Sequence, residues 1–212
     1  MAQAQHCNEH VNSCANIAQD YIKNVKRGRG YSCFLAKGHL VPDADFAYPS
    51  LKSSTFMYLN AVPQYQCANA GNWLNRVEKN ARAYALQSGT TLSIITGGHE
   101  QLHLPNSANV DAPLFLADNK SIVPRYTWKI VVDPNGAKAG IVFVMMNSPF
   151  AAATDMLSKC TVAVCTSANI VANGFEKIES GYTACCKVDD FMSHVAVPEN
   201  MRTSNLLVMN PK

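Results

Sequence analysis

Apolar residues between Asn72 and Gln87 recur at steps of three and four positions. The repeated residues are Trp73, Val77, Ala81, Tyr84 and Ala85. This spacing is typical of an amphipathic helix that packs one face on a core. Gly89 is the expected end of that helix, because glycine readily adopts the backbone conformation that terminates helices.

Short apolar runs elsewhere in the chain predict β-strands. They cover residues 31–36, 55–59, 91–96, 126–132 and 141–146. The last two runs flank the turn sequence Asp133-Pro134-Asn135-Gly136, so they predict a hairpin in the centre of a sheet, with Trp128 in the core. One long helix among several strands indicates an α+β fold, with a mixed, largely antiparallel sheet and flanking helices.

Three boundaries follow less directly from the same pattern. A strand over 55–59 places Asn60 at a strand end, and Gly97-Gly98 places His99 and His103 in a loop after a strand. Residues 106–121 show neither the three-to-four-residue spacing of a helix nor the alternation of a strand, and they predict an irregular insertion. We therefore expect a polar segment over 1–30, one domain over 31–195 and a C-terminal tail over 196–212.

Composition narrows the class of protein. The chain has 212 residues, of which 48% are hydrophobic and 16% charged, so it can bury a sizeable core. A net charge of +3 permits a nucleic-acid partner without requiring one. No apolar run reaches the length of about 18 residues that a membrane helix needs, and no membrane partner is expected.

The cysteines point to a compartment. There are eight, an even number that is typical of disulfide-bonded extracellular proteins. The first residues, MAQAQHCNEH, have neither the basic start nor the apolar core of a secretory signal. We expect a secreted type of sequence whose natural start is missing or altered here. An intracellular protein with reduced thiols is the alternative.

The residues that bear chemistry gather between 37 and 82. They are Lys37, Gly38, His39, Asn60, Asn69, Glu78 and Arg82. Histidine supplies a base near neutral pH, and glycine before it allows a phosphate to approach closely. Amide and carboxylate oxygens suit a hard cation, and cationic side chains suit a phosphate. Together these groups point to a metal-dependent phosphodiesterase.

The order of these residues resembles the DNA/RNA non-specific endonucleases of the ββα-metal (His-Me finger) superfamily, which includes endonuclease G and secreted arthropod nucleases. The matching residues are Gly38, His39, Leu40, Pro42, Asp45, Phe46, Asn60, Pro63, Gln64, Asn69, Trp73 and Glu78. Weaker similarity continues to about residue 191. The resemblance implies a ββα-metal fold and a nuclease that hydrolyses DNA and/or RNA with little sequence preference.

The resemblance also implies a role for each site residue. His39 would be the general base, Asn69 the ligand of Mg²⁺ or Mn²⁺, and Asn60 a residue that holds the active-site geometry. Glu78 would orient metal-bound water, while Lys37 and Arg82 would face the substrate phosphate. A homodimer stays open, as does the choice between DNA and RNA.

Three features depart from the family pattern. Lys37 replaces an arginine, Ala36 replaces an aspartate, and Trp73 and Glu78 are one residue farther apart than expected. In an α-helix one residue turns the face by about 100°. The alternative hypothesis is a catalytically weak or inactive nucleic-acid-binding paralogue, or a truncated gene product, that retains the fold.

The C-terminal cysteines also resemble those of arthropod members, in which such residues form disulfides. Cys185 and Cys186 are adjacent, and adjacent cysteines usually pair with distant partners. We therefore expect two bridges that join Cys160 and Cys165 to this pair, with the connectivity left open.

Overall fold

The computed structural model describes residues 25–27, 31–116 and 120–209. Its strands are β1 (Val25–Arg27), β2 (Tyr31–Cys33), β3 (Leu35–His39), β4 (Ala61–Tyr65), β5 (Ser93–Gln101), β6 (His103–Pro105), β7 (Asp111–Pro113), β8 (Phe115–Leu116), β9 (Ser121–Ile122), β10 (Pro124–Asp133), β11 (Ala139–Met146) and β12 (Thr183–Cys186). Most of the predicted 1–30 segment, with Cys7 and Cys14, lies outside the described residues.

The described helices are mostly short. They are α2 (Pro49–Ser54), α3 (Gln66–Ala68), the π-helix η4 (Asn69–Glu78), α4 (Lys79–Ser88), α5 (Val162–Ser167) and α6 (Val188–Phe191). Short 3₁₀ turns cover Asp43–Asp45, Tyr58–Asn60, Ala153–Asp155, Ile178–Ser180 and Glu199–Met201. No helix in the described ranges is both long and apolar enough to cross a membrane.

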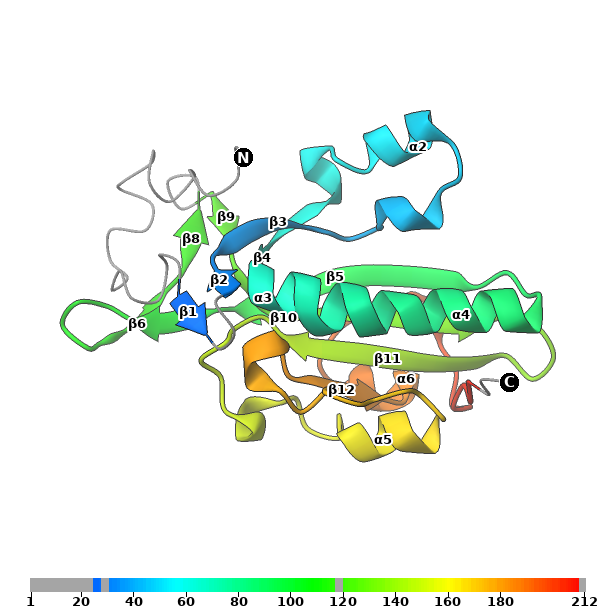
Figure 1. Ribbon diagram of the computed structural model, residues 1–212. Coiled ribbons are helices and arrows are strands. Elements are labelled where there is room, and N and C mark those ends of the chain that lie inside the picture. Colours follow the sequence, from blue (N-terminus) through cyan, green and yellow to red (C-terminus); the bar gives the residue numbers. More distant parts are fainter. Residues whose placement is uncertain (1–24, 28–30, 117–119, 210–212) are drawn as a thin grey trace.

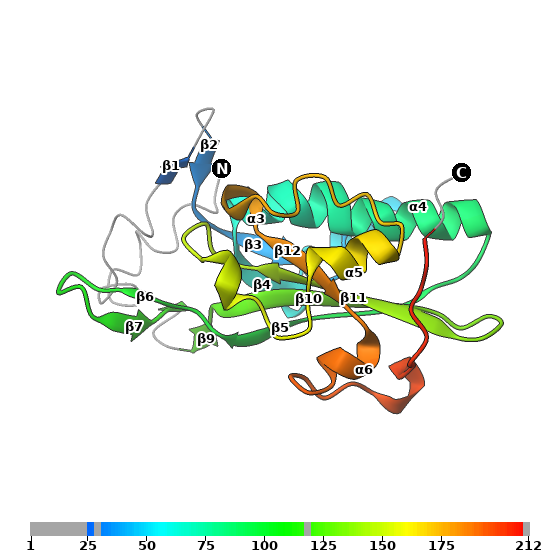
Figure 2. The same cartoon turned by 90° about the horizontal axis from the view of Figure 1, so that it is seen from below.

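The centre of the fold is an antiparallel sheet in the order β12-β11-β10-β5. The long helix α3–η4–α4 lies across one face of it, and α6 lies on the opposite side (Figures 1 and 2). Residues alternate between the two faces of a strand. Accordingly, Val131 packs with Trp73 and Val77 on the helix side, while Trp128 packs with Phe191 on the other. The predicted α+β class and the buried Trp128 are confirmed.

A second unit stands beside this sheet and carries the histidine. Strands β3 and β4 pair antiparallel, with His39 opposite Ala61, and the helix that begins at Gln66 follows directly. The strand–strand–helix order of the prediction is therefore present. Between the two strands, residues 40–60 make an excursion that contains α2 and projects away from the sheet (Figure 1).

Several predicted boundaries are corrected by the structure. The run 55–59 is not a strand: it follows α2 and ends in a 3₁₀ turn, and the strand begins after Asn60 rather than before it. Its side chains Phe56, Met57, Tyr58 and Leu59 are exposed, so no neighbouring strand packs on them and pairs with this run. Strand β5 runs on through Gly97-Gly98 to Gln101 because that whole length pairs with β10, which puts His99 in the strand.

The other corrections are smaller. The helix extends beyond the predicted Asn72–Gln87 at both ends and stops at Gly89, which has a φ of 64° as predicted. His103 lies in β6, and part of the supposedly irregular 106–121 segment forms short strand pairs. The predicted hairpin around Asp133 is confirmed in full by the pairing of β10 with β11.

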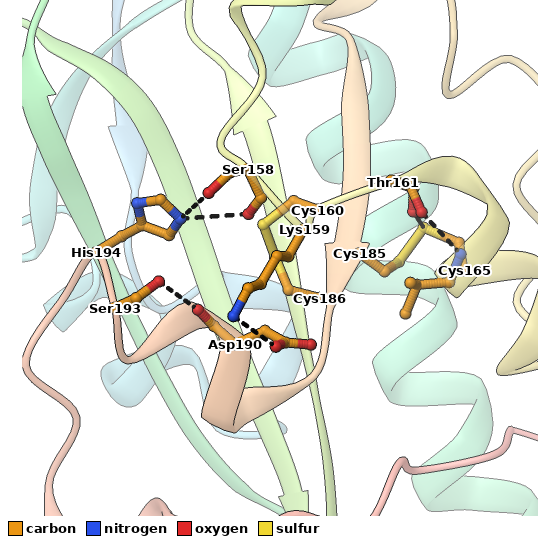
Figure 3. The surroundings of a disulfide bond; sticks show 11 residues. Ser158, Lys159, Cys160, Thr161, Cys165, Cys185, Cys186, Asp190, Ser193 and His194 are labelled. Atoms are coloured by element: carbon orange, nitrogen blue, oxygen red, sulfur yellow. Dashed lines mark hydrogen bonds and ion pairs between the residues drawn. A yellow bond between two sulfur atoms is a disulfide. The ribbon is translucent and has the colours of Figure 1, made fainter.

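All six cysteines of the described ranges form disulfides. The pairs are Cys33–Cys67, Cys160–Cys186 and Cys165–Cys185. The last two confirm the expected bridges between the 160/165 and 185/186 positions. Figure 3 shows these two bridges, which tie the segment before α5 (Cys160) and α5 itself (Cys165) to strand β12. Each cross-link of this loop size typically stabilises a fold by about 2–4 kcal/mol.

Candidate active site

His39 ends strand β3 and is half-buried. Its ring meets the Phe56 ring edge-on, with centroids 4.8 Å apart and an interplanar angle of 89°. Its Nε2 atom is buried and has no hydrogen-bond partner among the described residues. Burial lowers the pKa of His39, Asp43 partly opposes this, and Lys37 lowers it further. A neutral imidazole with an unused nitrogen can accept a proton.

Asn60 is the last residue of the 40–60 excursion, which begins directly after His39. Its Nδ2 donates to the Val41 carbonyl at 2.8 Å and to the Thr55 carbonyl at 2.9 Å. The Val41 amide donates back to Oδ1 at 2.9 Å, and the Leu40 amide donates to the Asn60 carbonyl at 3.0 Å. These bonds fix the two residues that follow His39 to the start of β4.

Gly38 is required by packing rather than by an open approach path. A Cβ at this position would lie 1.9 Å from Oε1 of Gln64. Gln64 is buried, and its Nε2 donates to Oγ1 of Thr127 at 3.1 Å. The space beside Gly38, expected to admit a phosphate, is therefore filled by a side chain that links β4 to β10.

The extra residue between Trp73 and Glu78 is absorbed by the π-helix η4. Its i→i+5 hydrogen bonding places residues five apart near one face, as spacings of three and four do in an α-helix. Trp73 and Glu78 are both buried, at 1% and 4% exposure. The backbone also leaves the helical region at Gly71, where a Cβ would approach the Ser180 carbonyl to 2.6 Å. The longer spacing therefore does not turn Glu78 out to solvent.

Glu78 lies in a group of opposite charges. Arg82 is 3.6 Å from Oε2 of Glu78, and its Nη1 donates to Oδ1 of Asp45 at 2.9 Å. The pair at i and i+4 thus shares one face, as its spacing predicts. Burial raises the pKa of Glu78, while Lys129 and Arg82 oppose that rise.

Lys129 is the residue that sequence reasoning missed. It lies in β10 with its side chain on the helix side of the sheet, and only 2% of it is exposed. Its ammonium donates to Oγ1 of Thr96 at 2.8 Å and to the Leu40 carbonyl at 3.4 Å, and lies 5.6 Å from the Trp73 ring. A single lysine inside the apolar run 126–132 was the available signal.

Glu78, Arg82, Asp45 and Lys129 line one pocket of about 460 Å³, between α4 and the edge of the sheet. The Lys129 ammonium also donates to the carbonyl of Leu40, the neighbour of His39. It thereby connects this helix-side group to the β3–β4 strand pair. A larger cavity of about 1040 Å³ lies elsewhere, beside β5 and β6. None of the predicted site residues lines that larger cavity, so we place the candidate site at the β3–β4 strand pair and the helix α3–η4–α4.

The remaining predicted residues are placed as follows. Lys37 donates to the Phe56 carbonyl, and its ammonium lies 4.4 Å from the centre of the Tyr58 ring. Asn69 is the first residue of η4 and is half-buried. No hydrogen bond in the described part of the chain joins Asn69 to His39 or to Glu78. The Lys129–Leu40 hydrogen bond connects the residue next to His39 to the Glu78–Arg82 group, whereas no described hydrogen bond or ion pair connects Asn69 to either.

Comparison with known proteins gives a consistent picture. The family model of DNA/RNA non-specific endonucleases matches residues 6–191. A salivary endonuclease of Lutzomyia longipalpis is 34% identical over 174 residues, which is 81% of this chain and 42% of that protein. Salivary protein Tsal1 of Glossina morsitans morsitans is 34% identical over 181 residues, 84% of this chain and 44% of that protein.

The chain therefore spans less than half the length of these relatives. A chain of the crystal structure of the EndoG/EndoGI complex aligns with a TM-score of 0.42 at 16% identity, covering 74% of this chain and 60% of that one. The family model covers most of the sequence, including every residue assigned above to the site. The chain belongs to the DNA/RNA non-specific endonuclease family.

Proposed function

We propose that the protein hydrolyses phosphodiester bonds of DNA and/or RNA, with little sequence preference, in the presence of a divalent cation. The observation that carries this proposal is His39, a half-buried histidine whose Nε2 has no partner in the described chain and whose pKa is lowered by burial. At neutral pH such an imidazole is uncharged and free to take a proton, as a general base must.

His39 takes the proton from the water that attacks phosphorus. Asn60 acts by position, because its three side-chain hydrogen bonds hold the backbone that follows His39. The Phe56 ring, perpendicular to the imidazole, restricts it from one side. General-base catalysis of this kind typically contributes about 10²–10⁴-fold to a rate.

Asn69 would hold the divalent cation, with Mg²⁺ as the first choice and Mn²⁺ as the alternative. The described residues contain no group of three or more His, Cys, Asp or Glu side chains that could enclose a metal. One amide oxygen fits Mg²⁺, which keeps several waters and takes few protein ligands. When bound, the cation would neutralise charge that develops on the phosphate and its leaving oxygen.

The charged residues around the pocket have complementary roles in this proposal. Arg82, held by Asp45 and Glu78, supplies positive charge toward the phosphate. Lys37 supplies a second cation on the side of the hairpin. Glu78 orients water in the site, and buried Lys129 keeps that carboxylate compensated. A buried carboxylate without such partners would take up a proton.

We also propose an extracellular place of action. Three disulfides stabilise the described chain, and such bonds persist in oxidising compartments. The names of the two relatives describe them as salivary. Both observations agree with a protein that works outside the cell.

The test is cleavage of plasmid DNA and double-stranded RNA by the purified chain in Mg²⁺, in Mn²⁺ and in EDTA. We expect cleavage with either cation and none in EDTA. Asn69→Ala should require a much higher Mg²⁺ concentration, whereas Asn75→Ala, an exposed asparagine on the same helix, should not. Cleavage in EDTA at the full rate would exclude the metal-dependent reaction, and a folded protein that never cuts would exclude hydrolysis.

A further inference from the structure

Four consecutive apolar side chains are exposed beside the candidate site. Phe56, Met57, Tyr58 and Leu59, here named the aromatic rim, are 49%, 58%, 74% and 91% exposed. Consecutive exposed apolar residues are unfavourable in water unless they serve a function. Contiguous exposed apolar surface commonly marks a binding site.

The aromatic rim is continuous with the groups proposed to act on the phosphate. The Phe56 ring touches the His39 ring, at 4.8 Å between centroids. The Lys37 ammonium lies 4.4 Å from the centre of the Tyr58 ring and donates to the Phe56 carbonyl. The rim belongs to the 40–60 excursion that projects from the body of the protein (Figure 1). A ligand at His39 therefore has the rim as its immediate neighbour.

The charge around the rim selects the ligand class. Residues 46–60 contain Lys52 and no aspartate or glutamate. Asp43 and Asp45 lie earlier in the excursion, where Asp45 is paired with Arg82. An exposed aromatic ring under a lysine ammonium offers a stacking surface next to a cation. Nucleic acid presents the complementary pair, an anionic phosphate attached to a flat aromatic base, and proteins bind single strands with such combinations.

We propose that the aromatic rim binds unpaired nucleobases next to the phosphate to be cleaved, with Tyr58 as the main stacking surface. This inference rests on the proposed nuclease function, and it names the preferred form of the substrate. Every base has a stacking face, so the contact tolerates any sequence. Bases inside a duplex are already stacked, so single strands and locally opened duplexes bind best.

The test is fluorescence anisotropy in EDTA with a labelled single-stranded oligonucleotide, its duplex, and an abasic strand that has the same phosphates. Intact oligonucleotide is verified on a gel. Tyr58→Ala should weaken single-strand binding about tenfold, which corresponds to the loss of about 1.4 kcal/mol of base stacking. Tyr58→Phe should retain binding. Tyr48→Ala, which removes an equally exposed tyrosine at the start of α2, is the matched control and should bind as the unaltered protein does.

The abasic strand should bind the unaltered protein as weakly as the normal strand binds Tyr58→Ala. Equal losses for duplex and single strand, an equal loss in Tyr48→Ala, or tight binding of the abasic strand would overturn the proposal. Because binding is measured without cleavage, the two proposals can fail separately. A protein that loses single-strand affinity through Tyr58→Ala but never cuts DNA or RNA would support the rim and refute the hydrolysis.

Discussion

Replacement of Lys129 by methionine is the sharpest perturbation of the buried charges. Methionine has a similar length and leaves the strand pattern intact, but it removes the positive charge that faces Glu78. Both residues are nearly inaccessible, at 2% and 4% exposure, so solvent cannot replace the lost charge. We expect Lys129→Met to destabilise the fold and to lower the rate of cleavage.

The size of the effect follows from the contacts that remain. Removal of one member of a buried charge pair typically costs about 3–5 kcal/mol. Here Arg82 still lies 3.6 Å from Glu78, and burial of the Lys129 ammonium is itself unfavourable, since desolvation lowers its pKa. These two terms reduce the expected loss to about 2 kcal/mol of unfolding free energy. In a Glu78→Gln background the same substitution should cost about 1 kcal/mol or less, because only hydrogen bonds are lost.

The assay is urea unfolding of the unaltered protein, Lys129→Met, Glu78→Gln and the double variant. A coupling free energy of about 1 kcal/mol or more is expected. Thr127→Val, which removes another buried polar side chain of β10 on the same face, is the control and should be additive with Glu78→Gln. Additive effects of Lys129→Met and Glu78→Gln would refute the reasoning.

The same variant has a pH signature. Glu78 has a raised pKa in the fold, so it favours the folded state once protonated and costs stability when ionised. Removal of Lys129 raises that pKa further, because a compensating charge is lost. The destabilisation by Lys129→Met should therefore shrink as the pH is lowered from 8 to 4. A penalty that is constant or grows toward acid would contradict this assignment.

Three further predictions concern strand β3 and the excursion that follows it. Asn60→Ala should lower the free energy of unfolding by about 2–3 kcal/mol in urea titrations, since three side-chain hydrogen bonds are lost, and a loss below about 0.5 kcal/mol would argue against the role given to this residue. Asp43→Asn should lower the pKa of His39 in an NMR titration of the imidazole, because Asp43 raises it in the fold, and an upward shift would be inconsistent with that contact. Gly38→Ala should reduce the melting temperature by several degrees, and by less in a Gln64→Ala background; equal reductions would mean that Gln64 is not the obstacle.

Much of the fold was readable from local pattern. The helix up to Gly89 and the β10–β11 hairpin depend on spacing and turn residues, which are local signals. The bridges to Cys185 and Cys186 were expected from the resemblance to arthropod members and from the adjacency of these two cysteines, which left the connectivity open. The error at residues 55–59 has a physical cause. Aromatic and other large apolar residues favour strands only where neighbours bury them, and Phe56, Met57, Tyr58 and Leu59 are exposed.

The site was readable only in part for a related reason. The order of residues along the chain was enough to place His39 and Asn60 in the β3–β4 region and Glu78 and Arg82 on the helix that follows. It could not show that a π-helix corrects the longer Trp73–Glu78 spacing, since helix type depends on backbone hydrogen bonding. The role of Lys129 depends on three segments that meet only in the folded chain.

The most direct test of the central claim is the rate of DNA and RNA cleavage by His39→Ala in saturating Mg²⁺. His99→Ala, which removes a half-buried histidine of β5 stacked on Tyr126, is the matched control. If His39 is the general base, His39→Ala should cut about 10²–10⁴-fold more slowly, while His99→Ala stays close to the unaltered rate. A folded His39→Ala protein that cuts within a few-fold of the unaltered rate would contradict the account.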